Sequence, residues 1–320
     1  MDKSVLGLKL SNVMNSDFVL KKYAELTDGK PIGDKESYFA KLFNIALIFL
    51  QICPEEETCK QFIDTYLDTD VSNSEYPDLH VMPSFLEMFT GLTAAEVSEA
   101  LKHGVAVHFT TPKIAEQIKS SGKMSTLFSD EDRKLLYKGM AQADVNSKYI
   151  FTTGFGIKKG ICAGSITTGF YMFHTPETLS FLYGGNFFDG DKEAAMEFLE
   201  KSTENMEPET RDALRSKLRR VWDMTASKGK RTAVLIDRDK LKYKTNNYYG
   251  SDGQVARVEE IRPYMHGDLY DMHNIEMNLI EDEVPTSSLF FVDVPTIPEL
   301  DKRVEEMKSK DSKAKEQEQK

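Results

Sequence analysis

Cysteine is scarce in this sequence, which argues against a fold held together by disulfide bonds. The 320 residues include three cysteines, Cys53, Cys59 and Cys162, and their number and spacing do not match a disulfide framework. Cys53 and Cys59 could form one bond, but reduced thiols are the favoured interpretation. We therefore expect a cytoplasmic protein, and export by a secretion system that reads some other signal stays open.

The sequence also lacks a surplus of positive charge and a long apolar run. The net charge is −11, which argues against sequence-independent binding to nucleic acid or to an anionic membrane, although a local basic groove stays compatible with it. The longest apolar run, residues 45–53, is too short to cross a bilayer. Residues 1–8 lack the architecture of a signal peptide. No membrane partner is expected.

Hydrophobic residues make up 40% of the chain, so a sizeable core is available for one large domain or two ordinary ones. Residues 1–102 are predicted to form a helical accessory region. Apolar side chains there recur at the spacing of one buried helix face; they are Phe39, Leu42, Phe43, Ala46, Leu47 and Leu50. Thr93 and Glu96 have the spacing of a capping box that opens a further helix.

After residue 103 the pattern changes to short strands and helices of uneven length, which predicts an α+β domain over residues 103–298. Val105–Phe109 is a predicted strand, and Pro112–Ser121 a helix closed by Gly122. Residues 191–228 are predicted to be a charged helical insertion, residues 244–252 a polar loop, and residues 299–320 a tail that is frayed or disordered. Further strands are predicted at residues 148–153, 170–173, 232–237, 275–280 and 288–294.

Familiar site motifs are missing from this second region. The glycine-rich stretch at residues 154–169 holds neither a GxGxxG that opens a helix nor a lysine-bearing phosphate loop. His266 and His273 flank two aspartates without an HExxH or CxxC spacing, so no metal site is expected. Cys162 as a nucleophile is a weak hypothesis, because nothing local specifies a base for it.

Three other residues are ordinary when each is taken alone. His108 ends a predicted strand, where a backbone carbonyl can satisfy its ring. Tyr171 lies inside a predicted strand, where aromatic residues are common core residues. Glu276 lies in the strand predicted at residues 275–280, and a carboxylate in a strand usually lies on a solvated face.

Taken together and in order, these residues resemble the histidine–tyrosine–glutamate branch of the ADP-ribosyltransferases, the group of diphtheria toxin and the poly-ADP-ribose polymerases. The first block is the strand that ends in His108, followed by Thr110 and by a helix that ends in glycine. The second is Gly-Phe-Tyr171 with a helix carrying Tyr183. The third is the late strand with Glu276, followed by a proline turn and a last strand. Phe109 departs from the glycine common in the polymerases, and Glu259 and Glu260 compete with Glu276 for the acidic position.

The resemblance implies a split antiparallel sheet and NAD as co-substrate, with no metal. His108 would hydrogen-bond the adenosine-side ribose with help from Thr110, and Tyr171 and Tyr183 would enclose the nicotinamide ring. Glu276 would stabilise the ribosyl cation. The loop before it would recognise the acceptor, with candidates Tyr264, His266 and Tyr270.

The expected activity is transfer of ADP-ribose to a macromolecule, and the acidic balance favours protein over nucleic acid as the acceptor. Two alternatives stay open: an NAD glycohydrolase, with water as acceptor, and a non-catalytic binding module of the same fold. The acceptor, the oligomeric state and the biological role, as toxin, effector or housekeeping enzyme, do not follow from the sequence.

Overall fold

The chain divides into two units, residues 1–104 with 292–320, and residues 105–291. This division lies two residues after the boundary expected at 102/103, and it joins the C-terminal segment to the N-terminal helices. The computed structural model describes these parts of the chain: residues 3–68, 82–93, 96–97, 100, 103–125, 129, 131–132, 134–135, 138, 161–162, 164–165, 196–197, 199–201, 203–225, 230–237, 239, 246–249, 255–257, 275–277, 279–280 and 283–318.

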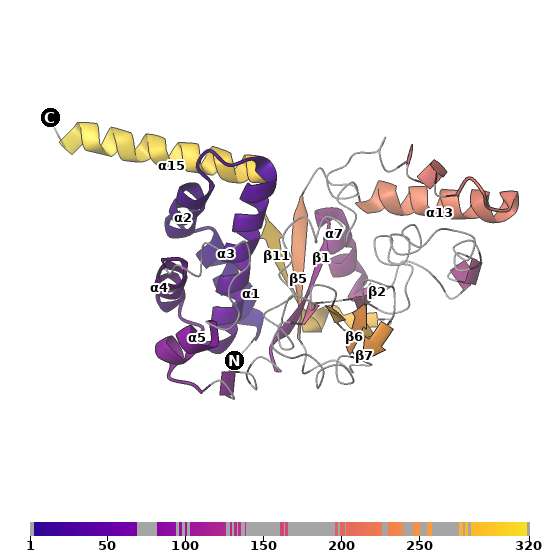
Figure 1. The fold of residues 1–320 in the computed structure, drawn as a ribbon, viewed down its shortest axis with the longest axis horizontal. Helices are drawn as coiled ribbons and strands as arrows, with labels where there is room; N and C mark the ends of the chain where they lie inside the picture. Colours follow the sequence, from indigo (N-terminus) through magenta and orange to yellow (C-terminus); the bar gives the residue numbers. More distant parts are fainter. Residues whose placement is uncertain are drawn as a thin grey trace. The chain divides into compact units, whose positions relative to one another are not determined.

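The first unit is helical, as its apolar spacing predicts (Figure 1). Its central helix is α3, which contacts α1, α2, α4 and α15. Every residue from 41 to 50 in α3 is buried, which explains why its apolar positions extend around the helix. The helices of this unit are α1 (Lys3–Met14), α2 (Asp17–Thr27), α3 (Ile32–Ile52), α4 (Glu56–Leu67), α5 (Met82–Thr90) and α15 (Ile297–Glu318).

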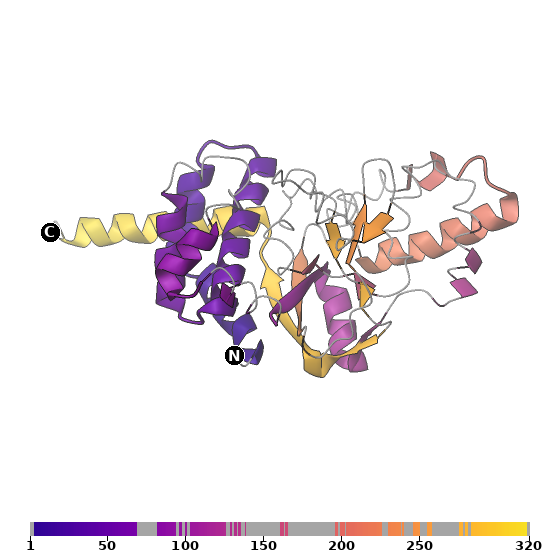
Figure 2. The same cartoon turned by 60° about the horizontal axis from the view of Figure 1, so that its bottom comes forward.

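The C-terminal segment forms helix α15, where composition favoured a frayed helix or a disordered tail from residue 299. The first turns of α15 carry Ile297, Leu300 and Val304, which are 6%, 0% and 8% exposed. Apolar residues at this spacing give the helix one face that packs against its unit. The composition of the whole segment does not indicate this face, because the later residues are polar. Beyond these turns α15 projects past the other helices of its unit (Figures 1 and 2).

Polar contacts join the start of α15 to the N-terminal helices. The Tyr23 hydroxyl donates to a carboxylate oxygen of Asp301 at 3.1 Å, and the Lys35 ammonium lies 2.8 Å from the other oxygen. Arg303 donates to the side-chain oxygen of Asn15 at 2.8 Å. The two ends of the chain therefore form one packed helical unit.

The second unit is mixed α and β, with small antiparallel sheets, in line with the α+β prediction. One sheet has four strands in the order β11-β5-β1-β4, another has three in the order β7-β6-β8, and the pairs β10-β2 and β3-β9 complete the set. The strands are β1 (Val105–Thr110), β2 (Lys123–Ser125), β3 (Ile161–Cys162), β4 (Gly164–Ser165), β5 (Arg231–Asp237), β6 (Asn246–Tyr249), β7 (Val255–Arg257), β8 (Ile275–Met277), β9 (Leu279–Ile280), β10 (Glu283–Pro285) and β11 (Leu289–Val294).

Two predictions about this unit are wrong in detail. The polar loop expected at residues 244–252 contains β6, because Asn246–Tyr249 pairs with a strand on each side. The single strand expected at residues 275–280 is two strands, since β8 pairs with β6 and β9 pairs with β3. In both places pairing with other segments decided the structure, and the composition of each stretch alone did not reveal it.

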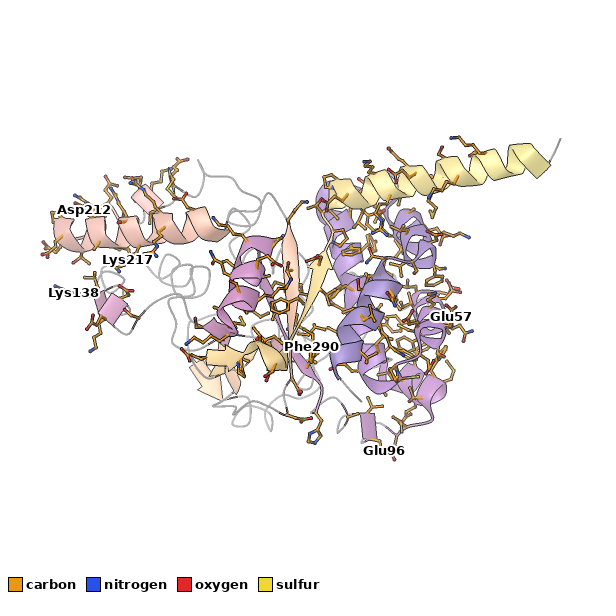
Figure 3. The ribbon with its side chains drawn as sticks, turned by 180° about the vertical axis from the view of Figure 1, so that it is seen from behind. Glu57, Glu96, Lys138, Asp212, Lys217 and Phe290 are labelled. Carbon is orange, nitrogen blue, oxygen red and sulfur yellow. The ribbon has the colours of Figure 1, made fainter. Side chains whose placement is uncertain are left out.

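Within the described residues the charged insertion is mostly helical, with turns at residues 203–206 before its main helix α13 (Pro208–Thr225). Arg215 and Arg219 both pair with Glu200, at 2.7 and 2.6 Å. Lys217 pairs with Asp132 and lowers the pKa of that carboxyl through a hydrogen bond. Figure 3 shows Lys217 on the side of α13 that faces the segment carrying Lys138. These ion pairs connect α13 to the segments that carry Glu200 and Asp132.

Candidate functional site

The first part of the candidate site is β1 with the helix that follows it, α7 (Pro112–Ser121). The Thr111 side chain caps α7 by accepting a hydrogen bond from the Ile114 amide at 3.3 Å, and Pro112 occupies the first turn. Gly122 ends α7 with φ = +76°, a backbone conformation that glycine adopts without strain. The predicted bounds of the helix are confirmed, and the strand extends one residue past its predicted end, to Thr110.

The pairing of β1 with β5 shows which face of the sheet His108 occupies. His108 stands opposite Val234, and Thr110 opposite Thr232. Opposed residues of an antiparallel pair project from the same face of the sheet. Val234 belongs to an apolar cluster with Ile118 of α7, so His108 and Thr110 lie on the face of the sheet that α7 covers.

Burial separates the two side chains on this face. His108 is half-buried, whereas Thr110 is 5% exposed and its partner across the strands, Thr232, is 1% exposed. Buried hydroxyl groups require hydrogen-bond partners, so the threonines act as structural polar groups of the sheet as well as candidate ligands. Of these side chains, His108 is the most exposed.

Glu276 lies in β8, the middle residue of a three-residue strand. It stands opposite Asn247 of β6. On its other side β8 comes close to β4, and β4 pairs with β1 through Val107 and Ala106. The strand of His108 and the strand of Glu276 are therefore both neighbours of β4, although about 170 residues separate them in the sequence.

Tyr171, Tyr183, Tyr264, His266 and Tyr270 lie outside the described residues, as do the competing acids Glu259 and Glu260. Within the described residues the candidate site therefore consists of β1 with His108, the helix α7 and β8 with Glu276.

Cysteine and metal chemistry receive no support from the described residues. Cys53 and Cys59 are free thiols. Burial raises the pKa of Cys59 to about 12, so its thiol stays protonated and unreactive near neutral pH. Cys162 stands opposite Leu279 in the β3–β9 pair. Within the described parts of the chain, no group of three or more His, Cys, Asp or Glu side chains is arranged to hold a metal ion.

Two residues next to the candidate glutamate were missed by sequence reasoning. Asn247 of β6 stands opposite Glu276 on one side and opposite Arg257 of β7 on the other. Asn247 fell in a predicted loop and Arg257 in a charged segment with no assigned role. The two tyrosines at 248 and 249 were the one local signal for a strand here, because aromatic residues favour strands.

Comparison of the chain with protein-family models, with curated proteins and with solved structures finds no match. Among the described residues, no helix is both long enough and apolar enough to span a membrane.

Proposed function

We propose that this protein is an NAD-dependent ADP-ribosyltransferase of the histidine–tyrosine–glutamate branch, with residues 103–298 folded as the split antiparallel sheet of that family. The observation that carries the proposal is the order of the three blocks. Strand β1, which carries His108, precedes a capped helix that ends in glycine, then comes Gly-Phe-Tyr171 with Tyr183, and last a strand with Glu276 before a proline turn and a final strand.

The neighbourhood of β4 supports the proposal. A site that cleaves NAD must hold the two riboses of one molecule at fixed positions, so it needs the histidine and the glutamate on elements that lie near each other. Because β1 pairs with β4 and β8 comes close to β4, the two strands share a neighbour, which supports this arrangement. The half-buried His108 and the buried Thr110 share one face of β1, which suits a ribose whose hydroxyl groups both donate and accept.

Cleavage of NAD depends on positioning and on charge stabilisation more than on strong acid–base catalysis. Breaking the nicotinamide glycosidic bond leaves positive charge on the ribosyl carbon, and the carboxylate of Glu276 would stabilise that charge. Nicotinamide departs as a neutral molecule and an acceptor nucleophile attacks the same carbon. With a net charge of −11, a protein acceptor is more compatible with this chain than a nucleic acid.

The test is nicotinamide release from NAD by the wild type and by Glu276→Gln. Removing an electrostatic stabiliser of the transition state typically lowers kcat by about 10²–10³-fold, and we expect a loss of that order with the fold kept. The matched control is Glu283→Gln, since Glu283 is an exposed carboxylate on the nearby strand β10, paired with Lys123. Equal turnover in Glu276→Gln and Glu283→Gln would overturn the glutamate assignment.

The product that receives the label from NAD distinguishes transfer from hydrolysis. With labelled NAD, an enzyme that transfers ADP-ribose labels a macromolecule, whereas a glycohydrolase releases free ADP-ribose. If neither product forms, calorimetry with NAD separates a non-catalytic module without an NAD site from an enzyme that lacks its acceptor. No heat at millimolar NAD would contradict the proposal.

A further inference from the structure

The chain passes between its two units at two places, and both lie at strands of the sheet that carries His108. The first place is between residues 104 and 105, where β1 begins, and the second follows Phe291, inside β11. In the strand order β11-β5-β1-β4, β11 and β1 are the two neighbours of β5. One strand of this sheet therefore continues directly into the helical unit.

The first half of β11 is packed into the core of the second unit. Leu289 is 5% exposed and belongs to one apolar cluster with Val234 of β5, and Phe291 packs against that cluster. Val234 also stands opposite His108 in the pairing of β5 with β1. The packing of β11 thus supports the strand that pairs with the strand of His108.

A link of two residues joins the end of β11 to α15, which begins at Ile297. The first is Pro295, whose ring fixes φ. The amide of the second, Thr296, donates to the side chain of Glu299 at 3.0 Å, and the Glu299 amide donates to the Thr296 hydroxyl at 3.3 Å. Two residues span about 7 Å when extended. Because the link is this short, α15 cannot move much farther than that unless β11 moves with it.

The start of α15 is held on the N-terminal helices by apolar packing and by polar contacts. Leu300 is 0% exposed. Asp301 accepts a hydrogen bond from the Tyr23 hydroxyl of α2 and forms an ion pair with Lys35 of α3. Ion pairs that are partly exposed contribute little stability, so the burial of Leu300 is the stronger of the two attachments.

We propose that β11 and α15 form a strap, residues 289–318, through which the N-terminal helices stabilise the edge of the sheet that carries His108. The N-terminal helices hold α15, and α15 holds the end of β11. Displacement of α15 from these helices would then loosen β11 and, through β5, the strand of His108. The inference goes beyond the proposed function, because it concerns the sheet and can be tested whether or not the protein cleaves NAD.

Amide hydrogen exchange tests the strap, because it measures the opening of each strand and helix separately. The experiment compares the full-length wild type with Leu300→Ala, which removes a buried side chain from α15 and weakens its packing. We expect exchange to become at least about 10-fold faster in α15 and also in β11, with a smaller change in α7. Lys310→Ala, on the exposed part of α15, is the matched control and should leave both elements unchanged.

Two results would overturn the inference. Faster exchange in α15 with unchanged exchange in β11 would show that the two elements open independently. Equal acceleration in β11 and α7 would show a general loss of stability in the second unit. If Leu300→Ala does not fold, Asp301→Asn replaces it, because this change weakens the contacts with Tyr23 and Lys35. Its control is Glu306→Gln, at an exposed position of the same helix, and the same two results would decide.

Discussion

At the scale of single residues, the position of His108 in the sheet changes how this residue is interpreted. Its strand is apolar, and a histidine at the end of such a strand is usually a satisfied structural group. Here it shares the α7 face of the sheet with Thr110 and stays half-buried. Its strand β1 pairs with β4, and β4 comes close to β8, the strand that carries Glu276.

The first residue-scale prediction concerns NAD binding. His108→Ala removes one hydrogen-bonding group from the proposed ribose site, and a hydrogen bond contributes about 0.5–1.5 kcal/mol. We expect NAD affinity to fall by about 3- to 10-fold, measured by calorimetry. His103→Ala, five residues earlier at an exposed position, is the matched control. An unchanged affinity in His108→Ala would remove the histidine from the site.

A second residue-scale prediction concerns stability and pH. Lys41 is 8% exposed in α3, and burial lowers its pKa from 10.5 to about 8. Between these values the unfolded chain binds a proton that the folded chain does not, so this group makes the free energy of unfolding rise with pH. Below pH 8 its full destabilising effect is present.

Denaturant unfolding of the wild type and Lys41→Met measures this effect. The stability of Lys41→Met relative to the wild type should be greatest below pH 8 and decline as the pH approaches 10.5, by up to about 3 kcal/mol. Lys308→Met, on the exposed part of α15, should show no such trend. A constant difference between Lys41→Met and the wild type would contradict the shifted pKa.

At the scale of elements, α15 is the part of the fold that composition described least well. Leu300 is fully buried, and Tyr23 and Lys35 both contact the neighbouring Asp301. Truncating a buried leucine costs about 2–5 kcal/mol, so Leu300→Ala should lower the free energy of unfolding by that amount. Lys310→Ala, on the exposed part of the same helix, should cost almost nothing. Equal effects would mean that α15 does not belong to the core of its unit.

Elements with strong local signals could be predicted from the sequence. Thr111, Pro112 and Gly122 marked both ends of α7, and Thr93 and Glu96 form the reciprocal capping contacts expected of them. These signals are local because a cap satisfies backbone groups within a few residues of itself. The α+β character of the second unit followed in the same way from its periodicities.

Elements that depend on distant partners could not be predicted. Asn246 and Asn247 look like loop residues, yet they form β6 because strands lie on both sides of them. The register that sets Arg257 and Glu276 on either side of Asn247 exists only through that pairing, so the composition of these stretches could not reveal it. For the candidate site, His108 and Glu276 were named from the sequence, and the residues that pair with their strands became known only from the sheet.

At the scale of the whole molecule, the chain combines a helical unit closed by its own C-terminal helix with a mixed unit that carries the candidate site. The acidic balance of the chain, −11, applies to its surface as a whole and favours a protein acceptor. For the whole protein we propose one activity, the transfer of ADP-ribose from NAD.

Incubation of the full chain with labelled NAD and a cell lysate tests that claim most directly. The account predicts a labelled protein with the wild type and with the Glu283→Gln control, and almost no label with Glu276→Gln. Free labelled ADP-ribose without any labelled macromolecule would contradict transfer, and equal labelling by the wild type and Glu276→Gln would contradict the proposed site.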